Sequence, residues 1–94
     1  MSIISTEPAV QLSTYKVVVY DNSSGDILRG VKVSIPELGE SHKTNENGIA
    51  VFETLPQGVF RVHFEMFGYF TRTQITVLRT DEELTQVVRI QKLD

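Results

Sequence analysis

The sequence predicts an all-β sandwich of about seven short strands. Segments in which apolar and polar residues alternate are separated by clusters of Asn, Asp, Gly and Pro, at a spacing of roughly 8–12 residues that is typical of sandwiches. No segment repeats its apolar residues with the period of about 3.6 over the length of a helix. The apolar content of 40% is that of an ordinary globular domain.

The chain of 94 residues is long enough for one two-layer core and contains no cysteine, so packing alone must stabilise it. Its net charge is −3 and its nine Lys and Arg residues are scattered, which argues against nucleic acid or an anionic membrane surface as the main partner. No apolar run is long enough to span a membrane, and the first residues lack a secretory signal. We therefore expect a protein that is cytoplasmic as synthesised; export within a particle, or excision from a secreted protein, stays open.

Residues 1–13 contain Pro8 and lack periodicity, so we expect a flexible N-terminal arm ahead of a single domain at 14–94. The first strand, 14–21, is apolar on both faces, which favours the middle of a sheet or a contact with a partner. One face carries Tyr15, Val17 and Val19, and the other carries Lys16, Val18 and Tyr20. The polar residues of 21–26 then predict a turn.

Proline and glycine delimit the next elements. Strand 31–38 should end at its proline or lie at a sheet edge, because proline cannot donate a hydrogen bond to a ladder. Residues 39–43 fit a loop or a short edge strand. The Asn-Gly pair at 47–48 favours the positive φ that tight hairpins require, and strand 49–54 leads to a second turn at 55–58.

The last three strands are expected at 59–67, 71–78 and 84–93, and a single helical turn fits at 80–84. In the strand 71–78, the branched apolar residues should face the core and Thr76 should face solvent. The predicted core consists of Val17, Val19, Val31, Val33, Ile35, Ala50, Phe52, Leu55, Phe60, Val62, Phe64, Ile75, Val77, Val88 and Ile90.

Several motifs follow one another in a characteristic order. They are Asp21 with Gly25 and Leu28, GVKVSI at 30–35, TNENG at 44–48, Phe52, LPQGVFRV at 55–62 and Gly68-Tyr69. Together they resemble the carboxypeptidase regulatory-like domain over residues 15–90. The resemblance implies a transthyretin-like (prealbumin-like) and Ig-like Greek-key sandwich. In that family the domain is a non-catalytic accessory in metallocarboxypeptidases, outer-membrane receptors and other multidomain bacterial proteins, which implies a structural or interaction role here.

Two related groups have activities that depend on particular residues. Cna B-like pilin domains form a Lys–Asn isopeptide bond beside a buried acid. The corresponding positions hold Val19 and Phe64 in this chain, and the last strand, 87–93, has no Asn. We therefore expect no self-crosslink, and hence an intact mass without the loss of one ammonia. Transthyretin-like hydrolases of 5-hydroxyisourate end in Tyr-Arg-Gly-Ser, whereas this chain ends in QKLD, so that activity is not expected.

The chain predicts no catalytic residue, metal ligand or cofactor. His42 is expected in a loop and His63 on the outer face of a strand, whereas zinc requires three or four ligands close together. The segments 21–26 and 45–47 lack the EF-hand pattern, and no serine lies in a nucleophile elbow. We therefore expect that the protein is not an enzyme; a small hydrolase with His63 beside an arginine and an acid is the least favoured alternative.

Aromatic residues suggest where a partner could bind. The two candidate interaction surfaces consist of Phe67, Tyr69 and Phe70, and of Tyr15, Val18 and Tyr20. The first group either covers the core or forms an exposed patch. The favoured function is a non-catalytic structural or protein-interaction module of a larger assembly or multidomain chain, which binds a protein partner through a sheet edge or a strand end. A carbohydrate-binding module is the alternative, and a homo-oligomer stays open.

Overall fold

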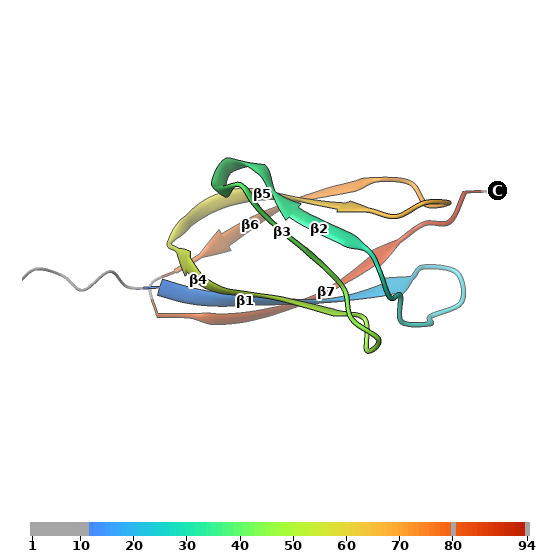
Figure 1. Ribbon diagram of the computed structural model, residues 1–94, viewed down its shortest axis with the longest axis horizontal. Coiled ribbons are helices and arrows are strands. Elements are labelled where there is room, and N and C mark those ends of the chain that lie inside the picture. The colour runs from blue at the N-terminus through green and yellow to red at the C-terminus, as the bar shows by residue number, and fades with distance from the viewer. Residues whose placement is uncertain (1–11, 80, 94) are drawn as a thin grey trace, which may run out of the picture.

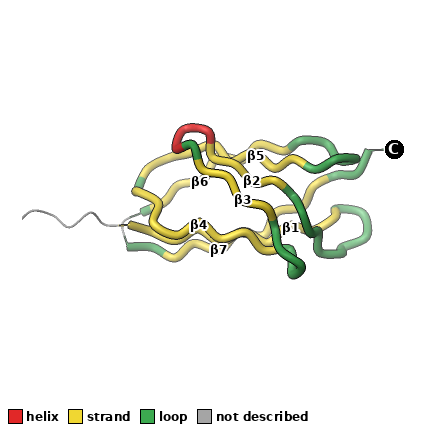
Figure 2. Tube along the Cα trace, in the orientation of Figure 1, coloured by secondary structure: helices red, strands yellow, loops and turns green. Residues whose placement is uncertain are grey.

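The computed structural model describes residues 12–79 and 81–93, which form two β-sheets packed face to face (Figure 1). The strands are β1 (Leu12–Asp21), β2 (Lys32–Ile35), β3 (Glu40–Lys43), β4 (Ile49–Pro56), β5 (Gly58–Glu65), β6 (Arg72–Leu78) and β7 (Glu83–Ile90). One sheet has the order β4-β1-β7 and the other β3-β2-β5-β6. The expected seven-stranded all-β sandwich is confirmed. The described residues contain one helical segment, the 3-10 turn η1 (Pro36–Leu38), and no helix long and apolar enough to cross a membrane (Figure 2).

β1 lies at the centre of the three-stranded sheet. It pairs antiparallel with β4 and parallel with β7, from Thr14 opposite Glu83 to Asp21 opposite Ile90. Parallel neighbours require a long connection between them. Here the connection from β1 to β7 includes the four strands of the other sheet. This central position agrees with the apolar character of both faces of β1.

The ends of β1 and β7 differ from expectation. β1 begins at Leu12, and Ser13 is buried, with its hydroxyl accepting from the Glu82 N–H at 3.1 Å. Leu12 and Ser13 therefore belong to β1 and not to an arm, and the rest of the predicted arm, residues 1–11, lies outside the described residues. The expected helical turn at 80–84 is wrong at residues 83 and 84, because β7 begins at Glu83. Thr80, the first residue of that expected turn, lies outside the described residues. The N–H of Thr14 donates to the Glu82 carbonyl at 2.9 Å, which extends the β1–β7 pairing up to the turn.

The two predicted turns form, but neither closes a hairpin. Asn45 accepts at its Oδ1 from the N–H groups of Asn47 and Ile49, and Gly48 has φ of 77°. However, β3 and β4 belong to different sheets, as do β4 and β5, which are separated only by Gln57. Local turn chemistry reverses the chain in both places, whereas the burial of alternate residues decides which sheet the next strand joins.

The register of β6 is the opposite of the predicted one. Thr76 and Leu78 are each 2% exposed, whereas Ile75 is 59% exposed and Val77 is 52% exposed. Thr76 faces inward because its hydroxyl donates to the Gln86 Oε1 at 3.2 Å, across the gap between the two sheets. The inward placement of Ile75 and Val77 was therefore wrong.

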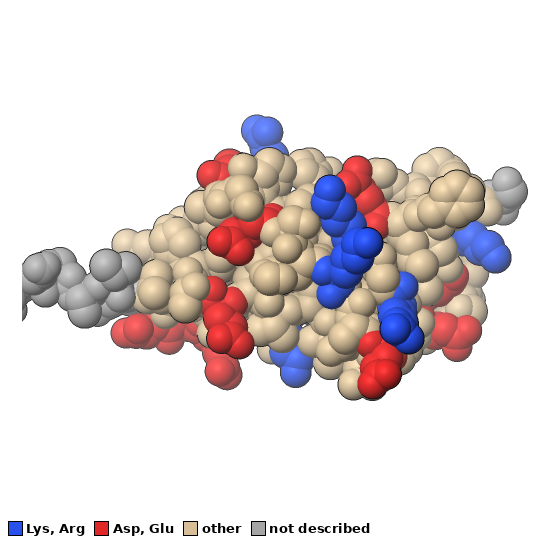
Figure 3. Space-filling model, in the orientation of Figure 1, with Lys and Arg blue, Asp and Glu red and all other residues tan. Residues whose placement is uncertain are grey.

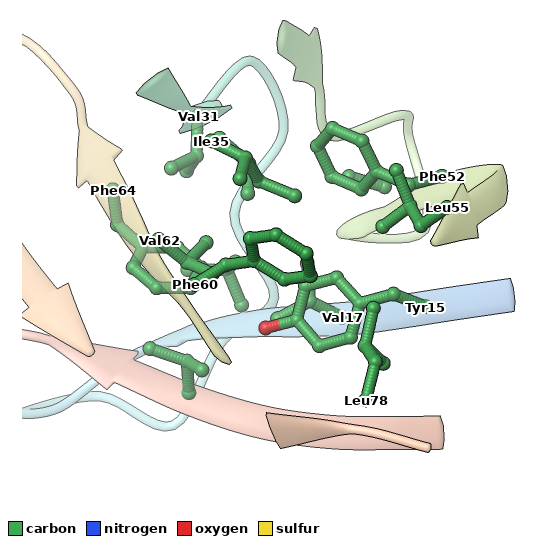
Figure 4. Packing of buried hydrophobic residues seen from close by; sticks show 14 of the residues in the cluster. Tyr15, Val17, Val31, Ile35, Phe52, Leu55, Phe60, Val62, Phe64 and Leu78 are labelled. Carbon is green, nitrogen blue, oxygen red and sulfur yellow. The ribbon is translucent and has the colours of Figure 1, made fainter. Parts of the chain in front are cut away.

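The core lies between the sheets and contains all the predicted core residues except Ile75 and Val77. Figure 4 shows the Phe60 ring of β5 lying beside the Tyr15 ring of β1. The prediction missed Tyr15 and Leu78, which are both buried. Tyr15 packs against Phe52 with ring centroids 6.0 Å apart, so an aromatic pair fills the end of the core near the start of β1.

Candidate functional site

The loop between β5 and β6 presents two exposed aromatic rings at one end of the sandwich. The side chain of Phe67 is fully exposed and that of Phe70 is 57% exposed, whereas Tyr69 is half-buried and packs against the core. The interpretation of this group as a lid over the core is therefore wrong for Phe67 and Phe70. We call these two residues and their loop the aromatic tip.

Backbone hydrogen bonds hold the aromatic tip against the end of β7. The N–H of Phe70 donates to the Gln91 carbonyl and the N–H of Leu93 donates to the Gly68 carbonyl, both at 2.8 Å. The N–H of Tyr69 also donates to the Met66 carbonyl at 3.0 Å. Because the bonds to Gln91 and Leu93 tie the loop to the segment after β7, the tip holds its rings on an ordered backbone, which reduces the entropy that a partner would have to remove on binding.

A charge-assisted hydrogen bond to the Asp21 carboxylate links the aromatic tip to the turn at 21–26. The Tyr69 hydroxyl donates to the Asp21 Oδ2 at 2.5 Å, and the Asp21 Oδ1 accepts from the N–H groups of Ser23 at 2.7 Å and Ser24 at 3.0 Å. These bonds, that from Tyr69 first, hold the pKa of Asp21 below its usual value. The same bond to the carboxylate raises the pKa of Tyr69. The turn at 21–26 and the aromatic tip are thus coupled through one carboxylate.

The second predicted surface is divided by the pleat of β1. Tyr15 is fully buried and points into the core, so its assignment to a surface was wrong. The physical reason is the period of two along a strand, which places Tyr15 on the same face as the buried Val17. Val18 and Tyr20 do lie on the outer face and are half-buried, and the Arg89 guanidinium sits 5.6 Å from the centroid of the Tyr20 ring.

The hydroxyl of Tyr15 belongs to a polar group between the edges of the two sheets. The Gln86 Oε1 accepts from the Tyr15 hydroxyl at 2.7 Å, the Gln74 Nε2 at 2.9 Å and the Thr76 hydroxyl at 3.2 Å. We call these four residues the Gln86 cluster. Burial raises the pKa of Tyr15, with the hydrogen bond to Thr76 opposing it, so the phenol stays neutral and donates.

A third surface was not foreseen. Val59, Ile75 and Val77 are exposed by 62%, 59% and 52% on the outer face of β5 and the edge strand β6, and Val59 lies directly opposite Val77. We call these three residues the β6 edge patch. The sequence contained part of the signal, since Ile75 and Val77 alternate with Thr76 and Leu78, but the choice between the two faces of β6 depends on Gln86 in another strand.

Charged side chains are unevenly distributed. Figure 3 shows basic side chains in a band over β2 and β3, and acidic ones on both sides of this band, several of them toward the end where the chain enters β1. Lys32 lies opposite Lys43 on one side and opposite Glu65 on the other, so an acid borders the basic band. A band this short and mixed in sign differs from the continuous basic stripe that nucleic-acid binding requires.

The two histidines occupy separate strands. His42 lies on β3 rather than in a loop, with its ring 4.7 Å from that of Phe52 and its Nε2 3.9 Å from a carboxylate oxygen of Glu40. His63 lies on β5, and its Nδ1 is 2.7 Å from the Thr73 hydroxyl. In the part of the chain that the structure describes, no three His, Cys, Asp or Glu residues come together as metal ligands.

Neither a protein-family model nor a curated protein sequence matches this chain. Among solved structures, part of the Bacillus anthracis TIE protein matches with a TM-score of 0.71 and 19% identity, over 87% of this chain and 17% of that one. A chain of a type II cohesin–X-dockerin complex from Acetivibrio cellulolyticus matches with a TM-score of 0.71 and 17% identity, over 85% and 58%. The group B streptococcus pilus 2b backbone protein matches with a TM-score of 0.67 and 14% identity, over 85% and 41%. This chain spans less than two thirds of each, and likenesses at these identities establish the β-sandwich fold.

Proposed function

We propose that this protein is a non-catalytic interaction module that binds a protein partner through the aromatic tip, as an accessory component of a larger assembly or multidomain chain. The observation that carries the proposal is the complete exposure of Phe67 on a loop whose backbone is bonded to the end of β7. A large aromatic ring in water is unfavourable unless a partner covers it, and aromatic anchors dominate the binding energy of protein interfaces.

Two further lines support the proposal. Structural neighbours include a cohesin–dockerin complex and a pilus backbone protein, which their names describe as parts of assemblies. The motifs that resemble a carboxypeptidase regulatory-like domain lie on turns and core positions here, as at Gly48 and Phe60, so they support an accessory scaffold of that kind and leave the binding residues to the loops.

The test uses the protein as bait in lysate of its native cell, beside the double variant Phe67→Ser/Phe70→Ser and the control Val87→Ser. Val87 is 58% exposed but lies on the outer face of the other sheet. We expect a partner that the wild type and the control retain and the double variant loses. Titration with that purified partner should then show at least about a tenfold weaker affinity for the double variant. Equal affinities would refute the aromatic tip as the contact.

Carbohydrate binding is the second candidate, favoured by the exposed ring of Phe70 beside Phe67. A structure titled as a putative carbohydrate-binding protein from Bacteroides uniformis also matches, with a TM-score of 0.64 and 9% identity, over 85% of this chain and 41% of that one. Tyr69 is less suited to stack on a sugar, because it is half-buried and its hydroxyl is bound to Asp21. Binding of oligosaccharides from a glycan panel that Phe70→Ser abolishes would select this function over protein binding.

A further inference from the structure

β6 is an edge strand without the features that usually prevent edge pairing. Between Arg72 and Arg79 it contains no charged residue, proline or glycine, and its outer face carries Ile75 and Val77. Long uncharged edges with exposed apolar residues are templates for pairing with another strand. Among the residues that the structure describes, no strand pairs with the outer edge of β6, so the backbone groups of that edge lie open beside the β6 edge patch.

Each of the other three edges carries at least one feature that hinders pairing. β3 is short and carries Glu40, His42 and Lys43, all exposed. β4 contains Pro56 and the irregular Thr54, with φ of 66°. The end of β7 is covered, because its Arg89 carbonyl accepts from the Arg72 guanidinium at 3.4 Å and the Gln91 carbonyl accepts from the Phe70 N–H. This contrast singles out β6 among the four edges.

We propose that β6 pairs with β6 of a second copy of this chain, antiparallel about a two-fold axis at Thr76, so that the two four-stranded sheets become one continuous sheet. This inference rests on the proposed function only in treating the protein as an interaction module. It concerns the β6 edge, whereas the proposed function concerns the aromatic tip. The occupant is a second copy because the strand is complementary to itself.

Self-complementarity follows from the residue spacing. With the axis at Thr76, Ile75 of one copy lies opposite Val77 of the other, and the reverse pair forms on the other side of the axis. Because Val59 already lies opposite Val77 within one copy, each apolar row would run Val59, Val77 and then the partner's Ile75. Thr76 meets its own counterpart on the inner face. Every exposed apolar residue of the patch is thereby placed beside another one.

Sedimentation velocity from about 10 µM to about 1 mM covers the range expected for so small an interface. We expect wild type to change from monomer to dimer in this range. Ile75→Lys should raise the dissociation constant at least about tenfold, because it places a charge within the apolar row. The control Val87→Lys, at an equally exposed position of the other sheet, should dimerise like wild type. Far-UV circular dichroism checks that all three are folded.

A disulfide test fixes the register, since the chain has no native cysteine. Residues directly opposite in antiparallel strands have Cβ atoms about 4.5–5.5 Å apart, close enough for a disulfide after small shifts. The double variant Ile75→Cys/Val77→Cys should form a disulfide-linked dimer on mild oxidation, and neither single variant should. A crosslink of Ile75→Cys alone would place the axis at residue 75 and overturn the proposed register.

The outcomes separate this inference from the function proposed above. A wild-type protein that stays monomeric up to about 1 mM, or a dimer that Val87→Lys dissociates and Ile75→Lys does not, overturns the β6 interface. A monomer that still binds a partner through Phe67 overturns only the β6 interface. A β6-paired dimer that binds no partner through the aromatic tip supports the β6 interface and refutes only the aromatic-tip contact.

Discussion

Replacement of Gln86 by leucine should destabilise the domain although it hardly changes the volume of the side chain, because it removes a buried hydrogen-bond acceptor. Gln86 Oε1 is the acceptor for the hydroxyls of Tyr15, which is fully buried, and Thr76, which is 2% exposed. Leucine has nearly the same volume but cannot accept, so both hydroxyls would lose this acceptor inside the sandwich. The hydrogen bond between Tyr15 and Thr76 could then satisfy only one of the two donors. A buried donor left unsatisfied costs about 1–3 kcal/mol, so Gln86→Leu should cost about 1–3 kcal/mol for the one donor that stays without an acceptor.

That loss is large for a domain whose total stability is on the order of 5–14 kcal/mol at this length. Urea unfolding followed by far-UV circular dichroism measures it, and a loss of about 2 kcal/mol corresponds to a fall in Tm of about 8–16 °C. The control is the double variant Tyr15→Phe/Gln86→Leu. It should lose less than the sum of the two single variants, because the phenol that Gln86→Leu strands is then absent. A Gln86→Leu protein as stable as wild type would refute the role of the Gln86 cluster.

Three other predictions concern the ends of the sandwich. Because the pKa of Asp21 is lowered in the folded state, its contribution to stability is complete above its usual value of 3.8 and disappears as the pH falls through the lowered value. Asp21→Asn should therefore flatten the acid side of the stability profile measured by urea unfolding. Tyr69, whose pKa is raised, contributes below about pH 10 and loses that contribution at higher pH. Gly48→Ala should cost more than the roughly 1–2 kcal/mol of a left-handed alanine, because its Cβ would lie 3.0 Å from the Cβ of Ile27. The control Gly25→Ala has a similar φ of 79° with no atom within 4 Å, so equal losses in denaturation midpoint for both variants would contradict the contact argument.

The sequence predicts the fold class and most of the core because alternation and turn residues are local signals. Val17, Val62 and Phe64 each share a strand face with other apolar residues, and burial follows from that pattern. The register of β6 could not be derived in this way, since both of its faces mix polar and apolar residues. The face is chosen by Gln86, ten positions beyond Thr76 and in the other sheet.

The interaction surfaces were predictable to different degrees. Phe67 and Phe70 follow the end of a regular strand, so their separation from the core could be inferred from position. Tyr15 was placed on a surface although it shares a strand face with the buried Val17 and Val19, because a strand that is apolar on both faces suggested a contact with a partner. The β6 edge patch was missed because strand order is non-local, and a local pattern does not reveal which strand lies at an edge.

The parallel pairing of β1 with β7 also gives the domain a direction of mechanical resistance. The chain enters β1 at one end of the sandwich and leaves β7 at the opposite end, and the two strands are neighbours along their length (Figure 1). Tension applied at these two points would pull β1 and β7 in opposite directions along their own axes. The ladder between them would then be loaded in shear, with its hydrogen bonds sharing the force instead of opening one after another. The domain should therefore resist a pull along this axis better than a pull that separates β1 from β7 starting at one end.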